Sequence, residues 1–106
     1  MKETIRIGNC SGFYGDRLAA AKEMVEGGPI DVLTGDYLAE LTMKILYDQR
    51  EQRGAHMGYV GTFLKQLEDV VELCMAKGIK IVTNAGGLNS AGMAVEVERI
   101  LQEKGV

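Results

Sequence analysis

Short apolar runs alternate along this chain with longer stretches in which apolar residues recur every three or four positions. The runs near Ile5–Ile7, at Ile30–Leu33 and at Ile79–Val82 are bounded by glycine or polar residues, which predicts buried strands. The three- and four-residue spacing predicts amphipathic helices between and after them. Their expected apolar stripes are Leu18, Ala21, Met24 and Val25; Leu38, Leu41, Ile45 and Leu46; Phe63, Leu67, Val70, Val71 and Cys74; and Met93, Ala94, Val97, Ile100 and Leu101.

The helix ends follow from polar caps and glycine stops. Asp16 is a natural N-cap for a helix over 17–26, which the glycines and proline of 27–29 would end. Asp36 can cap the second helix, which should end near Arg53. Thr62 is expected to cap the third helix, and a glycine follows each of the last two helices.

Strands that alternate with helices of this length imply right-handed crossovers and a parallel sheet. We therefore expect one α/β domain over residues 1–106: a Rossmann-like, three-layer piece with about three strands in the order 2-1-3 and flanking helices. Such a sheet has open edges, which favours a homo-oligomer or docking to another part of the protein. Residues 103–106 repeat the helix stop and strand start of 76–79, so we expect an amino-terminal fragment of a longer protein.

Composition and charge exclude several classes of partner. The net charge is -3 with both signs interspersed, so there is no basic face to hold nucleic acid. No apolar run approaches the roughly 20 residues of a membrane span. Cys10 and Cys74 form no C-x-x-C pair, and no apolar leader precedes the first strand. These features predict a reduced, cytoplasmic protein.

Polar residues gather where each strand gives way to a glycine turn. Parallel strands end at one edge of a sheet, where helix N-termini and glycine amides can hold an anionic or carbonyl-bearing small molecule. The alternative is structural: the glycines serve turn geometry and the polar side chains cap helices. The ligand-binding residues expected at this edge are Asn9, Ser11, Gly12, Asp36, Gly86, Gly87 and Asn89.

Three residues are candidates for catalysis. Asn84 stands between the third strand and the double glycine, ahead of any capping position. Cys10 stands at a strand end, where a helix dipole would lower its pKa, although a buried filler is the alternative. His56, the sole histidine, lies in the glycine-rich segment 54–61, which we interpret as a loop that acts as a lid. No cluster with metal-ligand spacing is visible, and the sequence names no cofactor.

Three motifs resemble one protein family. Residues 6–16 (RIGNCSGFYGD), 31–40 (DVLTGDYLAE) and 83–89 (TNAGGLN) are similar to the amino-terminal part of the acyclic terpene utilisation A (AtuA) family. The resemblance implies bacterial proteins several times longer than this chain, encoded beside genes for the breakdown of terpenes such as citronellol and geraniol. The intermediates of that breakdown are CoA thioesters, so the resemblance implies a ligand-binding part of an enzyme of this process, with an acyl-CoA or carboxylate as the expected ligand, and it does not specify the chemical step.

Two other functions remain open at this point. Gly8, Gly12 and Gly15 lie in a first strand-to-helix turn, and Asp36 follows about 20 residues later, as in an NAD- or NADP-binding domain of an oxidoreductase. The glycine spacing nevertheless departs from G-x-G-x-x-G. The open sheet edges equally suit a non-catalytic assembly module.

Overall fold

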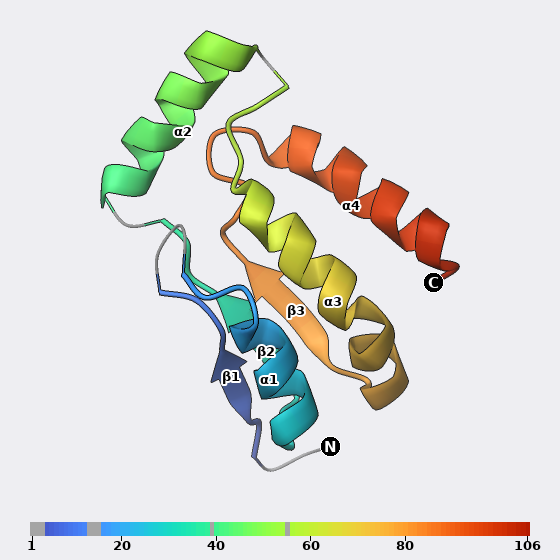
Figure 1. The fold of residues 1–106 in the computed structure, drawn as a ribbon. Helices are drawn as coiled ribbons and strands as arrows, with labels where there is room; N and C mark the ends of the chain where they lie inside the picture. The colour runs from blue at the N-terminus through green and yellow to red at the C-terminus, as the bar shows by residue number, and fades with distance from the viewer. Residues whose placement is uncertain (1–3, 13–15, 39, 55) are drawn as a thin grey trace.

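The computed structural model describes residues 4–12, 16–38, 40–54 and 56–106. Figure 1 shows a small sheet with α1 and α3 packed on one face, α4 beside α3, and α2 projecting away from the sheet. The predicted α/β class is confirmed, and each strand begins slightly later in the chain than expected. The elements are β1 (Ile7–Asn9), α1 (Ala20–Gly27), β2 (Val32–Gly35), α2 (Glu40–Arg53), α3 (Gly61–Lys77), β3 (Lys80–Thr83) and α4 (Ser90–Lys104).

The three strands are parallel, and their order is β1-β2-β3. The predicted order 2-1-3 is therefore wrong. Each connection between strands leads to the next strand on the same side, so the sheet extends in one direction. Right-handed connections of this kind place α1 and α3 on the same face of the sheet. Ala21 and Val25 of α1 share one apolar cluster with Val70 and Cys74 of α3. Because the order never reverses, the described sheet has no switch point of the kind that forms a ligand crevice.

The two faces of the sheet have different environments. Leu33 and Ile81 pack into the helical layer, which contains two apolar clusters around α3. On the opposite face, Ile7 is 65% exposed and Val82 is 58% exposed. Parallel sheets are usually covered on both faces. The described residues thus show two of the three predicted layers, the sheet and one layer of helices.

Helix α1 begins later than the cap at Asp16 predicted. Its first residue is Ala20, its N-cap is Ala19, and no side chain caps it. The carboxylate of Asp16 accepts instead from the backbone amides of Gly12 and Arg17, at 2.9 and 2.8 Å. These bonds hold Asp16 and Arg17 in the turn that precedes α1. Leu18 therefore lies outside the helix and is 40% exposed. The rest of the predicted stripe is correct, with Ala21 and Val25 fully buried.

Helix α2 ends at Arg53, as predicted. Its stripe is only partly right, because Leu46 is fully buried whereas Leu41 is 67% exposed. The helix begins at Glu40, so Asp36 lies in the preceding loop. Leu46, in the middle of the helix, packs into the apolar cluster that contains Val60 and Phe63, whereas Leu41 lies near the start of the helix and points away from it.

Helix α3 matches the sequence pattern best, whereas in α4 Ile100 is the one buried residue of the predicted stripe and Ala94 is exposed. All five residues of the predicted α3 stripe are buried. The helix begins at Gly61 with Val60 as its N-cap, so the predicted cap at Thr62 is wrong. The left-handed Gly78 and Gly105 end α3 and α4. None of the helices within the described ranges is long and apolar enough to cross a membrane.

Candidate functional site

The carboxyl ends of the strands bring polar residues from all three glycine turns to one edge of the sheet. Asn9 ends β1, Asp36 follows β2, and Asn84 follows β3. Since β2 is central, Asp36 lies between the other two. The predicted convergence of these residues is found in the structure, although its geometry differs from a crevice between adjacent β1 and β3.

Asn84 joins the end of β3 to the loop after β2. Its Oδ1 accepts the backbone N–H of Tyr37 at 2.9 Å, and its Nδ2 donates to Oδ1 of Asp36 at 2.9 Å. The Asp36 carboxylate also accepts from the amide of Leu38 at 3.4 Å. Asn84 therefore has a structural task, whatever else it does, because it fixes the position of the Asp36 carboxylate.

Asn9 and Thr34 form a second pair on the same edge. The Thr34 hydroxyl donates to Oδ1 of Asn9 at 3.1 Å, and Nδ2 of Asn9 donates to the carbonyl of Ser11 at 3.0 Å. Ser11 itself is 2% exposed, and its carbonyl also accepts the N–H of Asp36 at 2.9 Å. Ser11 thus ties the first turn to the second from inside the protein.

These side chains border a shallow hollow of about 320 Å³ on the open face of the sheet. Its lining contains one charged side chain, the carboxylate of Asp36. Such a hollow attracts hydroxyl and N–H donors and disfavours a bare anion close to Asp36. The lining residues are Asn9, Thr34, Gly35, Asp36, Val82, Thr83 and Asn84.

The glycine amides predicted to form an anion nest are largely engaged by the protein. The N–H of Gly12 donates to the carboxylate of Asp16, a bond that lowers the Asp16 pKa. The N–H of Gly87 donates to the carbonyl of Asn84 at 3.2 Å. At Gly86, a Cβ would lie 2.4 Å from Oγ of Ser90, so glycine allows the turn to approach α4. These contacts favour the turn-geometry interpretation of the three glycines.

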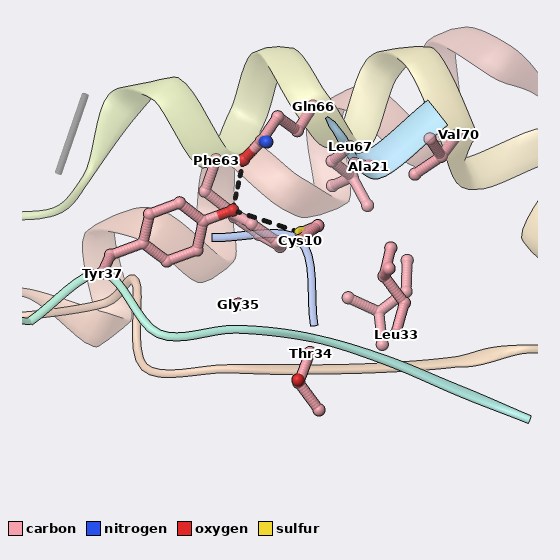
Figure 2. Close-up of a pocket in the computed structure, with 11 residues that line it drawn as sticks. Cys10, Ala21, Leu33, Thr34, Gly35, Tyr37, Phe63, Gln66, Leu67 and Val70 are labelled. Carbon is pink, nitrogen blue, oxygen red and sulfur yellow. Dashed lines mark hydrogen bonds between the residues drawn. The ribbon is translucent and has the colours of Figure 1, made fainter. Parts of the chain in front are cut away.

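Cys10 lies beneath the edge, not on it. Its Sγ is 3.9 Å from the Tyr37 hydroxyl, which donates to Oε1 of Gln66 (Figure 2). Burial raises the pKa of the Cys10 thiol, and the hydrogen bond between the thiol and Tyr37 offsets only part of this effect. The cavity here measures about 10 Å³, which leaves no room for a ligand. The predicted catalytic role of Cys10 therefore finds no support in this geometry.

Sequence reasoning missed the buried pair Tyr37 and Gln66. Tyr37 is 2% exposed and Gln66 is 3% exposed, and Tyr37 packs edge-on against Phe63 with ring centroids 6.0 Å apart. A signal was present, because Gln66 falls on the face of α3 that carries Phe63 and Val70. A polar side chain on the buried face of a helix needs a hydrogen-bond partner inside the protein.

The segment around His56 is tied to the β3–α4 turn. The N–H of Val60 donates to the carbonyl of Ala85, and the N–H of Leu88 donates to that of Gly58, both at 2.8 Å. His56 itself is exposed, while residue 55 lies outside the described residues. The lid remains a prediction, and any opening of it would have to break these bonds.

Asn89, predicted to bind ligand, is the N-cap of α4. Its Oδ1 accepts the N–H of Gly92 at 3.0 Å, and its Nδ2 donates to the carbonyl of Met57 at 3.0 Å. One side chain therefore caps the helix and anchors the loop that precedes α3. Of the ligand-binding residues predicted, Asn9 and Asp36 are the two whose side chains border the hollow.

The geometry gives no support to a dinucleotide site. Helix α1 begins only at Ala20, and the amide of Gly12 already has a carboxylate partner. A pyrophosphate would need those amides and a helix N-terminus directly after the turn. Gly15 lies outside the described residues. Across the described ranges, no three His, Cys, Asp or Glu side chains gather as metal ligands would.

Comparison with known proteins identifies a family that the chain matches. A protein-family model described as "Acyclic terpene utilisation family protein AtuA" matches residues 5–106. No curated protein and no solved structure matches the chain. The match covers almost the whole sequence, including all three turns at the sheet edge.

Proposed function

The chain belongs to the acyclic terpene utilisation family AtuA, and from this premise we propose that it binds an intermediate of acyclic terpenoid breakdown for an enzyme of that process. The ligand class is an acyl-CoA thioester or the related carboxylate. The binding place is the hollow bordered by Asn9, Asp36 and Asn84. The observation that carries the proposal is the position of this polar hollow at the carboxyl edge of a parallel sheet, in a chain of this family.

The available donors suit a carbonyl group. An amide side chain has two N–H donors on its nitrogen. Asn9 uses one on the carbonyl of Ser11, and Asn84 uses one on the carboxylate of Asp36. The second N–H of each is the donor that we assign to the ligand's carbonyl oxygen. A hydroxyl group on the ligand, or on a water, would donate to Asp36.

The charge of Asp36 decides between the two forms of the ligand. A carboxylate placed about 4 Å from Asp36 would be repelled by about 1 kcal/mol even in bulk water. The carbonyl of a thioester is neutral and avoids this cost. The thioester should therefore bind more tightly than the free acid.

A thermal-shift titration tests the proposal. The purified chain is melted with a ten-carbon acyclic terpenoyl-CoA, free CoA, the free terpenoid acid and the nicotinamide dinucleotides in separate series. A ligand at about 100 times its dissociation constant adds roughly 2.7 kcal/mol, which moves the Tm by several degrees. A shift with the thioester that exceeds the shift with the free acid is the expected result.

A matched pair of variants locates the site. Asn9→Asp keeps an acceptor for Thr34 but removes both amide donors, so it should abolish most of the thioester shift. Gln52→Glu makes the same amide-to-carboxylate change on an exposed position of α2 and should leave the shift unchanged. A cooperative melt that no terpenoid ligand displaces would contradict the proposal, and a shift with a dinucleotide alone would favour the oxidoreductase alternative.

A further inference from the structure

An apolar groove of about 770 Å³ lies between α3, α4 and β3. We propose that this groove binds the branched hydrocarbon chain of the acyl thioester whose carbonyl group is held in the hollow bordered by Asn9, Asp36 and Asn84. The inference rests on the proposed function and adds to it the surface that recognises the hydrocarbon part of the ligand. Three features of the structure support it.

The first feature is the continuity of the groove with the polar hollow. Val82 and Thr83 line both of them. Asn84, whose second N–H we assign to the carbonyl oxygen of the ligand, directly follows these two residues in the sequence. A thioester bound at Asn84 can therefore pass its hydrocarbon chain over the end of β3 and into the groove.

The second feature is the chemistry of the lining. Most of the side chains that line the groove are apolar, and they include Met75 and Met93. Methionine side chains adapt to irregular shapes, which suits a hydrocarbon with methyl branches. The two charged residues in the lining, Lys80 and Glu98, have opposite signs, so their charges cancel. A neutral hydrocarbon therefore suits this surface better than an anion or a charged peptide does.

The third feature is the size of the groove and its exposure to water. Its volume lies within the range of about 300 to 1,000 Å³ that is typical of small-molecule sites. A ten-carbon acyclic terpenoyl group has a main chain of eight carbons, which extends over about 9 Å at ordinary single-bond lengths. The strand from Thr83 back to Lys80 covers about 10 Å. In the unliganded protein, Met75 is 63% exposed and Val82 is 58% exposed, so a hydrocarbon along β3 would cover apolar surface.

Two thioesters of different length test the inference on the unmodified protein. Isothermal titration calorimetry compares acetyl-CoA with a ten-carbon acyclic terpenoyl-CoA, which share the carbonyl and the CoA group. A fully buried CH₂ group strengthens binding about four-fold, and a half-buried one about two-fold. Terpenoyl-CoA should therefore bind on the order of 100-fold more tightly than acetyl-CoA. Equal affinities would overturn the inference and leave the proposed function standing, whereas a lack of binding by either thioester would contradict the proposed function itself.

Two neighbouring residues of α4 provide a matched test of where the hydrocarbon binds. Ala94 is exposed and lines the groove, whereas Val95 is 66% exposed and does not line it. Ala94→Glu places a carboxylate in the groove and should reduce the preference for terpenoyl-CoA over acetyl-CoA by about 10-fold or more. Val95→Glu should leave that preference unchanged. An Ala94→Glu protein with the wild-type preference would overturn the inference.

Sedimentation velocity distinguishes this ligand from a second copy of the protein in the same groove. The Ala94→Glu protein should sediment like wild type at micromolar concentration, because the inference assigns the groove to the ligand. A wild-type dimer that Ala94→Glu converts into a monomer would show that a second copy covers the groove, and it would overturn the inference.

Discussion

Asn84 holds Tyr37 across 47 positions of sequence, since its Oδ1 accepts the backbone N–H of Tyr37 at 2.9 Å. The same side chain donates to the carboxylate of Asp36. The end of β3 thus positions both the acidic group of the proposed ligand site and the buried tyrosine behind it. The first expected effect of substituting Asn84 is therefore a lower free energy of unfolding.

Asn84→Ala should lower the free energy of unfolding by about 1 to 2 kcal/mol, because a part-buried hydrogen bond is lost and its donor is left without that acceptor. Urea denaturation followed by circular dichroism measures the change. Gln52→Ala, on the exposed side of α2, is the control and should stay near wild type. An Asn84→Ala protein as stable as that control would show that the bond to Tyr37 contributes nothing.

Gly35 should tolerate no side chain. A Cβ there would lie 2.5 Å from Cε2 of Tyr37, and the ring, only 2% exposed, has no free space to move into. Gly35→Ala should cost about 1 to 3 kcal/mol by overpacking. Gly27→Ala, at the end of α1 with nothing within 4 Å of the new Cβ, should be neutral or stabilise by up to about 1 kcal/mol. Thermal melts that rank the two variants in the opposite order would contradict this account.

Stability should fall in alkaline solution. Burial raises the pKa of Cys10 and Cys74 above the ordinary thiol value of 9.0, and raises that of Tyr37 above 10.0. A group with a raised pKa keeps its proton longer in the folded state, so its stabilising effect is complete below the unfolded pKa. The effect is lost as the pH rises from the unfolded pKa towards the folded one.

Urea titrations between pH 7 and pH 11 would measure this fall. Tyr37→Phe should reduce the slope above about pH 10, since the remaining contribution comes from the thiols. The slope is the relevant readout, because the variant also loses the hydroxyl bond to Gln66 and should be less stable at every pH. A wild-type free energy of unfolding that does not fall above pH 9 would contradict the prediction.

Asp36→Asn should change which ligand form binds. The substitution keeps an oxygen for Asn84 but removes the negative charge, so affinity for a free terpenoid acid should rise about five-fold, which corresponds to about 1 kcal/mol. Affinity for the neutral thioester carbonyl should change little. Isothermal titration calorimetry compares the two, with Asp69→Asn on the exposed side of α3 as the charge-matched control. Equal gains in both Asp variants would point to a general effect of net charge and away from the hollow.

The sequence predicted what depends on local spacing. The stripe from Phe63 to Cys74 is buried along its whole length, and the strand ends bring Asn9, Asp36 and Asn84 to one edge. Both results follow from periodicity and from the geometry of parallel strands. Neither required knowledge of which elements pack together.

Strand order and helix starts could not be predicted in this way. The strand order depends on the packing of Ala21 and Val25 against α3. The spacing of apolar residues shows that one face of a helix is buried, but it does not show which element covers that face. The start of α1 depends on which amides bind the Asp16 carboxylate. In the structure it accepts hydrogen bonds from two loop amides, whereas an N-cap would accept them from the first amides of the helix. The Tyr37–Gln66 bond joins a loop to a helix, and single-element patterns do not reveal it.

The order β1-β2-β3 also has a consequence for how the chain folds. Among the described strands, β2 pairs with β1 and β3 pairs with β2, so the sheet can grow at one edge in the order in which a ribosome releases the segments. We expect the amides of β2 that face β1 to gain protection before those of β3 during refolding, because the pairing of β2 with β3 must first close the longer loop through α2 and α3. Quenched hydrogen exchange would show the sequence of events, and simultaneous protection of all three strands would mean that the sheet forms in a single cooperative step.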